Sequence, residues 1–127
     1  MKEETVSRIA MVILAVVMAA FGLFHIMKPS SLIGFVPSFL PGGKVWVYVV
    51  GVAFMLVALA LLAHRQVKLA GYLLAIMLLV FILTIHLPNY LNSGDPEQRQ
   101  QAFVNLLKDS AIAAFALYIA SNARKIE

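Results

Sequence analysis

The chain has 127 residues, of which 62% are apolar and 13% charged, and its formal net charge is +4. Soluble domains carry about twice that fraction of charged residues, so the composition indicates a membrane protein. The basic residues stand in short groups between apolar runs, which excludes the continuous basic face that nucleic-acid binding requires. The chain has no cysteine, which excludes thiolate metal sites, iron–sulfur ligation and disulfide-forming chemistry of its own.

Four apolar runs, at about residues 9–27, 45–63, 69–87 and 103–120, predict four membrane spans. Each approaches the roughly 20 residues that cross a bilayer core, and none alternates as a barrel strand does. The first run is longer than the ~7–15 apolar residues of a signal peptide, so we expect it to be a span. The predicted fold is an all-α polytopic membrane protein, an antiparallel bundle of four transmembrane helices that forms a single domain over residues 1–127.

The distribution of lysine and arginine predicts the orientation of these spans. Six basic residues lie on one side, at positions 2, 8, 65, 68, 124 and 125. Lys28, Lys44 and Arg99 lie on the other side, with Lys108 just inside the last span. By the positive-inside rule we expect both termini in the cytoplasm and the protein in the cell membrane, which in a bacterium is the inner membrane.

The connection between the first two spans, residues 29–44, is too apolar for a free extracytoplasmic loop. Pro37 and Pro41 exclude a regular spanning helix within it. It has two interpretations: a lid over a lipidic ligand, with Phe35 and Pro37 as ligand contacts, or an interfacial anchor. By contrast, the stretch 92–101 is expected to be a solvated polar loop without a site.

Small residues and a weak internal sequence repeat predict how the helices pair. Gly22 and Gly51 lie within spans, where small residues allow helix backbones to approach closely. The first run ends His25-Ile26-Met27-Lys28-Pro29 and the third ends His86-Leu87-Pro88, so in both a proline follows shortly after a histidine. This similarity between the ends of the two runs fits two helical hairpins related by a parallel repeat.

Ionisable residues at similar depth in the outer leaflet are the candidates for a site, because such residues within a span are costly and often mark binding sites or proton paths. His25 and His86 are expected as hydrogen-bond donors or proton carriers, with Lys108 or Asp109 setting their charge. Adjacent residues point about 100° apart on a helix, so Lys108 and Asp109 are not expected both to pair with each other and to face one groove. The candidate ligand-binding residues are His25, His86, Lys108, Asp109, Asn105, Asn89, Phe35 and Pro37.

A structural interpretation of the same residues stays open. Each histidine can bond a carbonyl oxygen or a lipid headgroup, and Lys108 is shallow enough to extend its ammonium to the interface. Two histidines at equal depth can also ligate a haem, although that pattern is common by chance. We assign no catalytic residue and no metal ligand.

Several motifs together resemble those of the DoxX family, over residues 8–119. They are Phe21-Gly22-Leu23-Phe24-His25 leading to Pro29, Phe35-Val36-Pro37 with Pro41, the histidine-ended third run, and Asn105-Leu106-Leu107-Lys108-Asp109. The resemblance implies a four-helix integral membrane protein. It leaves the activity open, because some relatives are described as membrane subunits of thiosulfate:quinone oxidoreductases, some as partners of oxidative-stress enzymes, and distant ones as assembly factors for ion channels.

Two functions follow as hypotheses. The first is a small redox-associated membrane subunit that binds a quinone or another lipidic ligand in the outer leaflet and exchanges electrons through a membrane or redox partner protein. The second is a non-catalytic membrane scaffold or assembly factor that recognises another membrane protein through small-residue helix faces. Quinone is the only cofactor that we expect. The sequence does not decide whether the protein is an enzyme or whether it forms a homo-oligomer.

Overall fold

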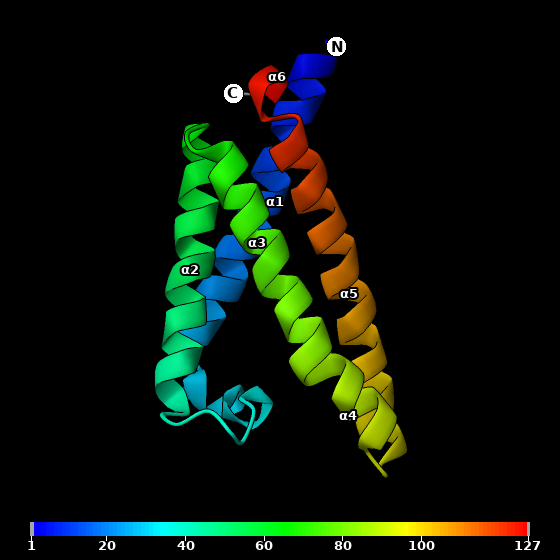
Figure 1. Ribbon diagram of the computed structural model, residues 1–127. Coiled ribbons are helices and arrows are strands. Elements are labelled where there is room, and N and C mark those ends of the chain that lie inside the picture. The colour runs from blue at the N-terminus through cyan, green and yellow to red at the C-terminus, as the bar shows by residue number, and fades with distance from the viewer. Residues whose placement is uncertain (1, 127) are drawn as a thin grey trace.

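Helices make up most of the part of the protein that its computed structural model describes, residues 2–126, and no strand occurs there. Two 3₁₀ turns, η1 and η2, lie in the connection between the first two long helices. The third long helix is interrupted by one π-helical segment, η3, without a break in the chain direction (Figure 1). The elements are α1 (Glu3–Met27), η1 (Pro29–Ser31), η2 (Ile33–Phe35), α2 (Lys44–Ala63), α3 (Val67–Phe81), η3 (Ile82–His86), α4 (Leu87–Asn92), α5 (Pro96–Ser121) and α6 (Ala123–Ile126).

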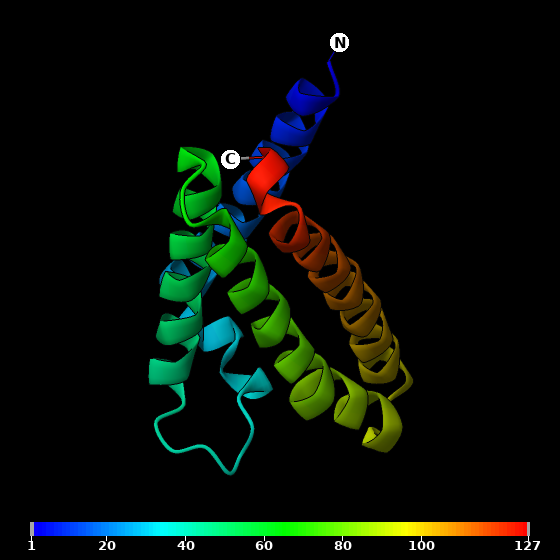
Figure 2. The ribbon, with the colours of Figure 1, turned by 45° about the horizontal axis from the view of Figure 1, so that its top comes forward.

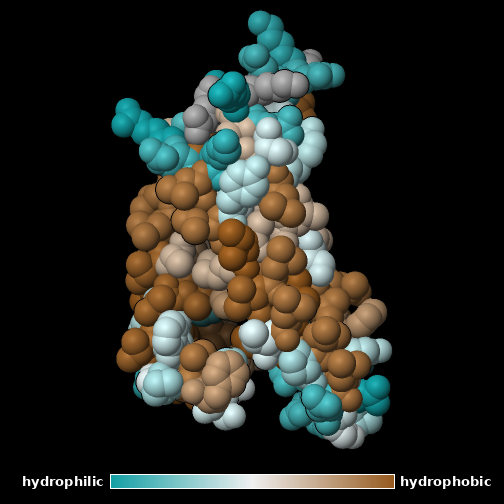
Figure 3. All heavy atoms as spheres, viewed as in Figure 1, coloured by the Kyte–Doolittle hydropathy of each residue, from teal (hydrophilic) through white to brown (hydrophobic). Residues whose placement is uncertain are grey.

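Four helices are long and apolar enough to cross a membrane: α1, α2, the continuous α3–η3–α4 helix and α5. Large apolar side chains point outward along them, with Ile13, Leu56 and Leu83 each at least 60% exposed. Water penalises such a surface but lipid does not. Polar side chains gather at the two ends of the molecule, and apolar ones cover its middle (Figure 3). The predicted all-helical class and the four candidate spans are confirmed, and they define a multi-pass membrane protein.

The helices pack in two pairs, α1 against α2 and α3–η3–α4 against α5 (Figure 1). Both termini and the turn between α2 and α3 lie at one end of the molecule, which we call the terminal end. The connection between α1 and α2 and the one between α4 and α5 lie at the other, which we call the loop end. The two pairs approach each other near the terminal end and diverge toward the loop end (Figure 2).

Glycines bring the backbones together within each pair. A Cβ atom added to Gly51 would lie 2.8 Å from the Cβ of His25 and 3.1 Å from the carbonyl oxygen of Gly22. In the other pair, a Cβ on Gly71 would lie 2.8 Å from the carbonyl oxygen of Ala116. Contacts this short leave no room for a side chain, which is how small residues hold helices together where lipid supplies no hydrophobic drive.

The third helix continues beyond its predicted end at Leu87, through Pro88, to Asn92. Proline lacks an N–H group, and its ring clashes with the carbonyl group four residues earlier, here that of Thr84. The chain avoids this clash by widening one turn, in which the N–H of Leu87 bonds the carbonyl oxygen of Ile82. The hydroxyl of Thr84 donates to the carbonyl oxygen of Val80 at 2.7 Å within the same region. The prediction that the third helix stops at His86-Leu87-Pro88 is therefore wrong.

The fourth helix begins at Pro96, seven residues before the predicted start at Phe103. Asp95 caps it, because its carboxylate accepts a hydrogen bond from the backbone N–H of Glu97 at 3.1 Å. Proline at the first helical position and an acidic residue in the first turn both favour a helix start. Hydropathy detects only the apolar part of such a helix, so most of the predicted 92–101 loop is in fact helical.

Candidate functional site

A cavity of about 700 Å³ lies at the loop end, between the α1–α2 pair and the α3–α5 pair. Its volume falls within the ~300–1,000 Å³ range of small-molecule sites. Apolar side chains from α1, α2, α3, η3, α5 and the 29–44 connection form most of its wall. The polar side chains that line it, apart from the indole of Trp46, are His25, Thr84, His86, Gln101, Asn105, Lys108 and Asp109.

Three phenylalanines and one histidine form a packed aromatic group on the cavity wall. Phe54 is 4% exposed, and its ring centroid lies 6.4 Å from those of both Phe21 and Phe81. The ring of His25 stands perpendicular to that of Phe54 with the centroids 5.3 Å apart. This part of the cavity offers shape and apolar surface, which suits a hydrocarbon chain or the face of a ring.

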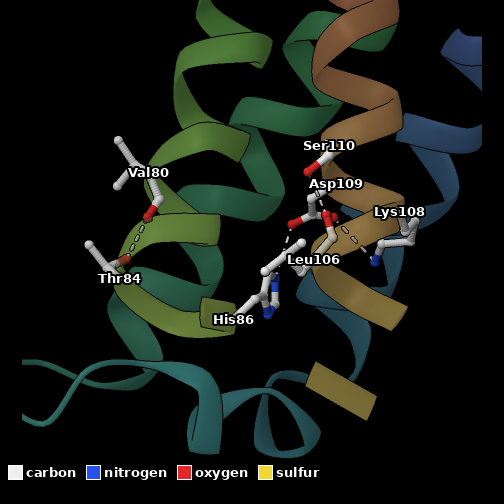
Figure 4. A network of polar contacts seen from close by, with 7 residues as sticks. All are labelled: Val80, Thr84, His86, Leu106, Lys108, Asp109 and Ser110. Atoms are coloured by element: carbon white, nitrogen blue, oxygen red, sulfur yellow. Dashed lines mark hydrogen bonds and ion pairs between the residues drawn. The ribbon is translucent and has the colours of Figure 1, made fainter. Parts of the chain in front are cut away.

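A buried polar pair, with one residue from each of two helices, also lines the cavity. The Nε2 atom of His86 lies 3.0 Å from Oδ2 of Asp109, and the two residues are only 8% and 4% exposed. The widened η3 turn precedes α4 and carries His86, and α5 carries Asp109 (Figure 4). A buried polar pair of this kind stabilises the helix contact only while both partners are present.

Lys108 completes this polar group. Its ammonium nitrogen lies 3.5 Å from Oδ1 of Asp109, the oxygen that does not face His86, and 4.7 Å from the ring centroid of Phe21 on α1 (Figure 4). The expectation that Lys108 and Asp109 would not both pair and face one groove is wrong. Their Cβ atoms do diverge, but the long lysine side chain curls back over its neighbour's carboxylate.

His25 makes the hydrogen bond to a carbonyl oxygen that the structural interpretation expects, and it also lines the cavity. Its Nδ1 atom lies 2.7 Å from the carbonyl oxygen of Phe21, one helical turn earlier. A carbonyl oxygen only accepts, so Nδ1 carries the proton and donates. The side chain is half-buried and lines the cavity.

The 29–44 connection lies against the cavity. The ring of Phe35 meets that of His86 nearly edge-on, with the centroids 6.4 Å apart and the planes at 70°. The connection is fixed to the start of α2, because the indole Nε1 of Trp46 donates to the carbonyl oxygen of Pro41 at 2.7 Å. Phe39 is 74% exposed, as an interfacial anchor would be. The side chains of the connection that line the cavity are Leu32, Phe35, Val36, Pro37, Phe39 and Leu40.

The structure brings seven of the eight candidate residues around this cavity: His25, His86, Lys108, Asp109, Asn105, Phe35 and Pro37. Asn89 does not line it. Because the helix continues past Pro88, Asn89 lies on the exposed side of α4. Among the residues that the structure describes, no three His, Asp or Glu side chains group closely enough to hold a metal ion.

Sequence reasoning missed two polar residues of the wall, Gln101 and Thr84. The polar stretch 92–101 predicts a solvated loop, yet Gln101 precedes Asn105 by four residues and Lys108 by seven. Those steps of three and four residues place all three on one helix face, so extending the helical periodicity would have found it. Thr84 carries no comparable signal, because it reaches the cavity through the π-helical turn.

These features define the class: an all-helical, multi-pass membrane protein with an apolar cavity that carries a buried polar group. A family model matches residues 14–120, most of the chain and part of every long helix, so the protein belongs to that family. The family is described as a domain of unknown function, DUF8561. No curated protein and no solved structure matches the chain. Since the family description states no activity, the function has to be argued from the cavity itself.

Proposed function

We propose that the protein is a small redox-associated membrane subunit that binds a quinone-type lipidic ligand in this cavity. The observation that carries the proposal is the combination of a mostly apolar chamber of about 700 Å³ with a buried His86–Asp109 pair on its wall. A ligand with an apolar tail and a small oxygen-bearing head matches both parts. Histidine and lysine are also the side chains that bond such oxygens and exchange protons with them.

In this proposal the chain supplies binding and proton handling, and electrons pass to or from a membrane or redox partner protein. The DoxX resemblance supports it, since some members of that family are described as subunits of quinone-linked oxidoreductases. We keep membership of the DoxX family as part of the proposal, carried by the motifs around His25, Pro37 and Asp109.

We also propose that the four spans form an antiparallel bundle with both termini in the cytoplasm, in the cell membrane and, for a bacterium, the inner membrane. The cavity then lies in the outer leaflet and the 29–44 connection is an apolar extracytoplasmic loop over it. The positive-inside rule supports this orientation. Basic positions 2, 8, 65, 68 and 124 belong to the terminal end of the molecule, whereas Lys28, Lys44 and Arg99 belong to the loop end.

The scaffold hypothesis is the weaker alternative. It relies on small-residue faces that would recognise another membrane protein, but Gly22, Gly51 and Gly71 are all occupied by contacts within this chain. It makes a different prediction, namely that cross-linking in native membranes recovers a stoichiometric partner protein and that changes to the cavity leave this association intact.

Trp46 provides a direct test of ligand binding, because it is the only tryptophan of the chain and it lines the cavity. We expect 2-decyl-1,4-benzoquinone to quench its fluorescence saturably, with one molecule bound per chain. Val50→Phe narrows the cavity and should weaken binding about tenfold, which corresponds to ~1.4 kcal/mol. The matched control is Val52→Phe on the same helix, where the side chain is 50% exposed and lies outside the cavity wall, so that affinity should not change.

The polar residues supply a second test. His25→Ala and His86→Ala each remove a hydrogen-bonding group from the cavity wall and should weaken binding of the quinone-type ligand, measured in its oxidised and its reduced form, about three- to tenfold. Affinity that stays at the wild-type value in both variants, while each folds, would refute the proposed site.

A further inference from the structure

Apart from the histidines, two ionisable side chains line the cavity among the residues that the structure describes, and they are exposed to very different degrees. The side chain of Asp109 is 6% exposed, whereas that of Lys108 is 41% exposed. Both carboxylate oxygens of Asp109 also have a partner. Its Oδ2 lies 3.0 Å from Nε2 of His86, and its Oδ1 lies 3.5 Å from the ammonium nitrogen of Lys108. The negative end of this ion pair is therefore closed off, and its positive end is the one that a ligand can reach.

The contacts of Lys108 place its ammonium group between the two helix pairs. The nitrogen lies 3.5 Å from Asp109 on α5 and 4.7 Å from the ring centroid of Phe21 on α1, and both of these residues line the cavity. It is thus held at the cavity and is not extended along the helix to the membrane interface, as a snorkelling lysine would be. An ammonium group has three N–H donors, and one carboxylate oxygen and the face of one ring do not accept from all of them. Donor capacity is left for a ligand.

A charged donor in an apolar chamber favours a ligand oxygen that carries negative charge. A hydrogen bond between ionised groups is about twice as strong as one between neutral groups, and it strengthens where apolar side chains exclude water. Asp109 is the only carboxylate on the described wall, and His86 and Lys108 share it. The cavity therefore matches an apolar molecule whose head is an anionic oxygen.

Phe21 joins this donor to the aromatic group of the wall. Its ring lies under the ammonium group of Lys108, and its centroid lies 6.4 Å from that of Phe54, which lies 6.4 Å from that of Phe81. A head whose charged oxygen is carried directly by a flat ring contacts the donor and the aromatic group together. A carboxylate at the end of a flexible chain uses only the donor.

We propose, on the basis of the proposed function, that Lys108 determines the class of ligand: the cavity prefers a quinone whose ring carries an ionised hydroxyl group, and this oxygen pairs with the ammonium group of Lys108. A hydroxyl group on a quinone ring is acidic because the conjugated carbonyl delocalises the negative charge of its anion. The shared chemistry is an apolar molecule with an anionic oxygen head, which a fatty acid also has, and the test separates these two sources.

Two matched pairs of probes with a ten-carbon chain test this proposal at neutral pH. The first pair is 2-decyl-3-hydroxy-1,4-naphthoquinone and its methyl ether, and the second is decanoate and 1-decanol. Quenching of Trp46 reports the two quinones, and displacement of the ether reports the other two probes. Affinities are expressed against the probe concentration in the micelle. We expect the hydroxyquinone to bind at least about tenfold more tightly than its ether, which corresponds to ~1.4 kcal/mol.

Variants of Lys108 separate its charge from its packing. Lys108→Met keeps an unbranched side chain without the ammonium group and should lower the preference for the hydroxyquinone over the ether about tenfold. Lys108→Arg keeps the positive charge and should retain most of the preference. Lys28→Met is the matched control, because it removes the same charge at the loop end from an exposed residue outside the cavity wall, and it should leave the preference unchanged.

The outcomes distinguish this inference from the proposed function. An ether that binds as tightly as the hydroxyquinone, or a preference that persists in folded Lys108→Met protein, overturns the inference and leaves the proposed function standing. If neither quinone binds saturably, the proposed function is overturned and this inference with it. Decanoate that binds more tightly than decanol and as tightly as the hydroxyquinone supports the role of Lys108 and overturns the quinone as its ligand in favour of a fatty acid. If Lys108→Met does not fold, Lys108→Arg and the wild-type probe series still decide the proposal.

Discussion

Gly51→Ala should loosen the α1–α2 pair and disturb the cavity at the same time. The added Cβ would lie 2.8 Å from the Cβ of His25 and 3.1 Å from the carbonyl oxygen of Gly22. Both atoms are fixed to the backbone of α1, so no rotamer change can relieve the contact. Carbon atoms in contact normally sit about 3.5–4.0 Å apart, and α1 therefore has to move by roughly 1 Å at this point.

The expected change in the unfolding free energy of Gly51→Ala is the difference between two opposing effects. Overpacking of this kind costs about 1–3 kcal/mol, whereas alanine in place of glycine within a helix gains about 1 kcal/mol. We expect Gly51→Ala to lose about 1 kcal/mol of unfolding free energy. Gly71→Ala should lose a similar amount, because its Cβ would lie 2.8 Å from the carbonyl oxygen of Ala116.

The two variants differ in their effect on the ligand. Gly51 packs against His25, which lines the cavity, whereas Gly71 is not part of the cavity wall. Unfolding in mixed detergent micelles followed by circular dichroism measures stability, and quenching of Trp46 measures quinone affinity. Gly51→Ala should lower both quantities and Gly71→Ala only stability. Gly34→Ala, whose Cβ would meet no atom within 4 Å, is the control. A more stable Gly51→Ala protein, or equal loss of affinity in both helix variants, would refute the reasoning.

Two further predictions concern the polar pair. Asp109→Ala leaves both ring nitrogens of buried His86 without a partner and should cost about 1–3 kcal/mol of unfolding free energy. Ser110→Ala, at an exposed neighbouring position, is the control and should change the unfolding free energy by less than about 0.5 kcal/mol. Equal losses of unfolding free energy in the two variants, measured from their denaturation curves, would contradict this account. Pro88→Ala removes the reason for the widened turn, so η3 should tighten, turn His86 away from Asp109 and lower quinone affinity about tenfold. The control is Pro96→Ala at the start of α5, which should leave the quenching of Trp46 unchanged. Unchanged quenching in Pro88→Ala would contradict the prediction, because it would mean that other contacts hold the turn open.

The sequence predicted the helices because hydropathy reports directly on which segments a bilayer accepts. It failed at two helix ends for two different reasons. Pro88 predicts a helix end, but a π-helical turn lets the helix continue past it. Pro96 went unnoticed although Asp95-Pro96-Glu97 is a capping pattern, because the helix it starts is polar for its first two turns.

Much of the cavity could also be predicted, because depth along a helix follows from the rise per residue. Depth placed His25, His86 and Lys108 at one level, and all three line the cavity. Depth does not say which way a side chain points around the helix. The direct pairing of His86 with Asp109 and the unpartnered Nδ1 atom depend on the rotation introduced by η3, and only the three-dimensional structure shows them.

Native mass spectrometry of the mildly solubilised protein, with extraction and identification of whatever it carries, tests the central claim most directly. Wild-type protein and the Val50→Phe and Val52→Phe variants are compared in the same preparation. We predict one molecule with the mass of a quinone or hydroquinone per wild-type chain, retained in Val52→Phe and lost in Val50→Phe. A wild-type protein that carries no such molecule, or an occupancy that is the same in all three proteins, would contradict a ligand in the cavity.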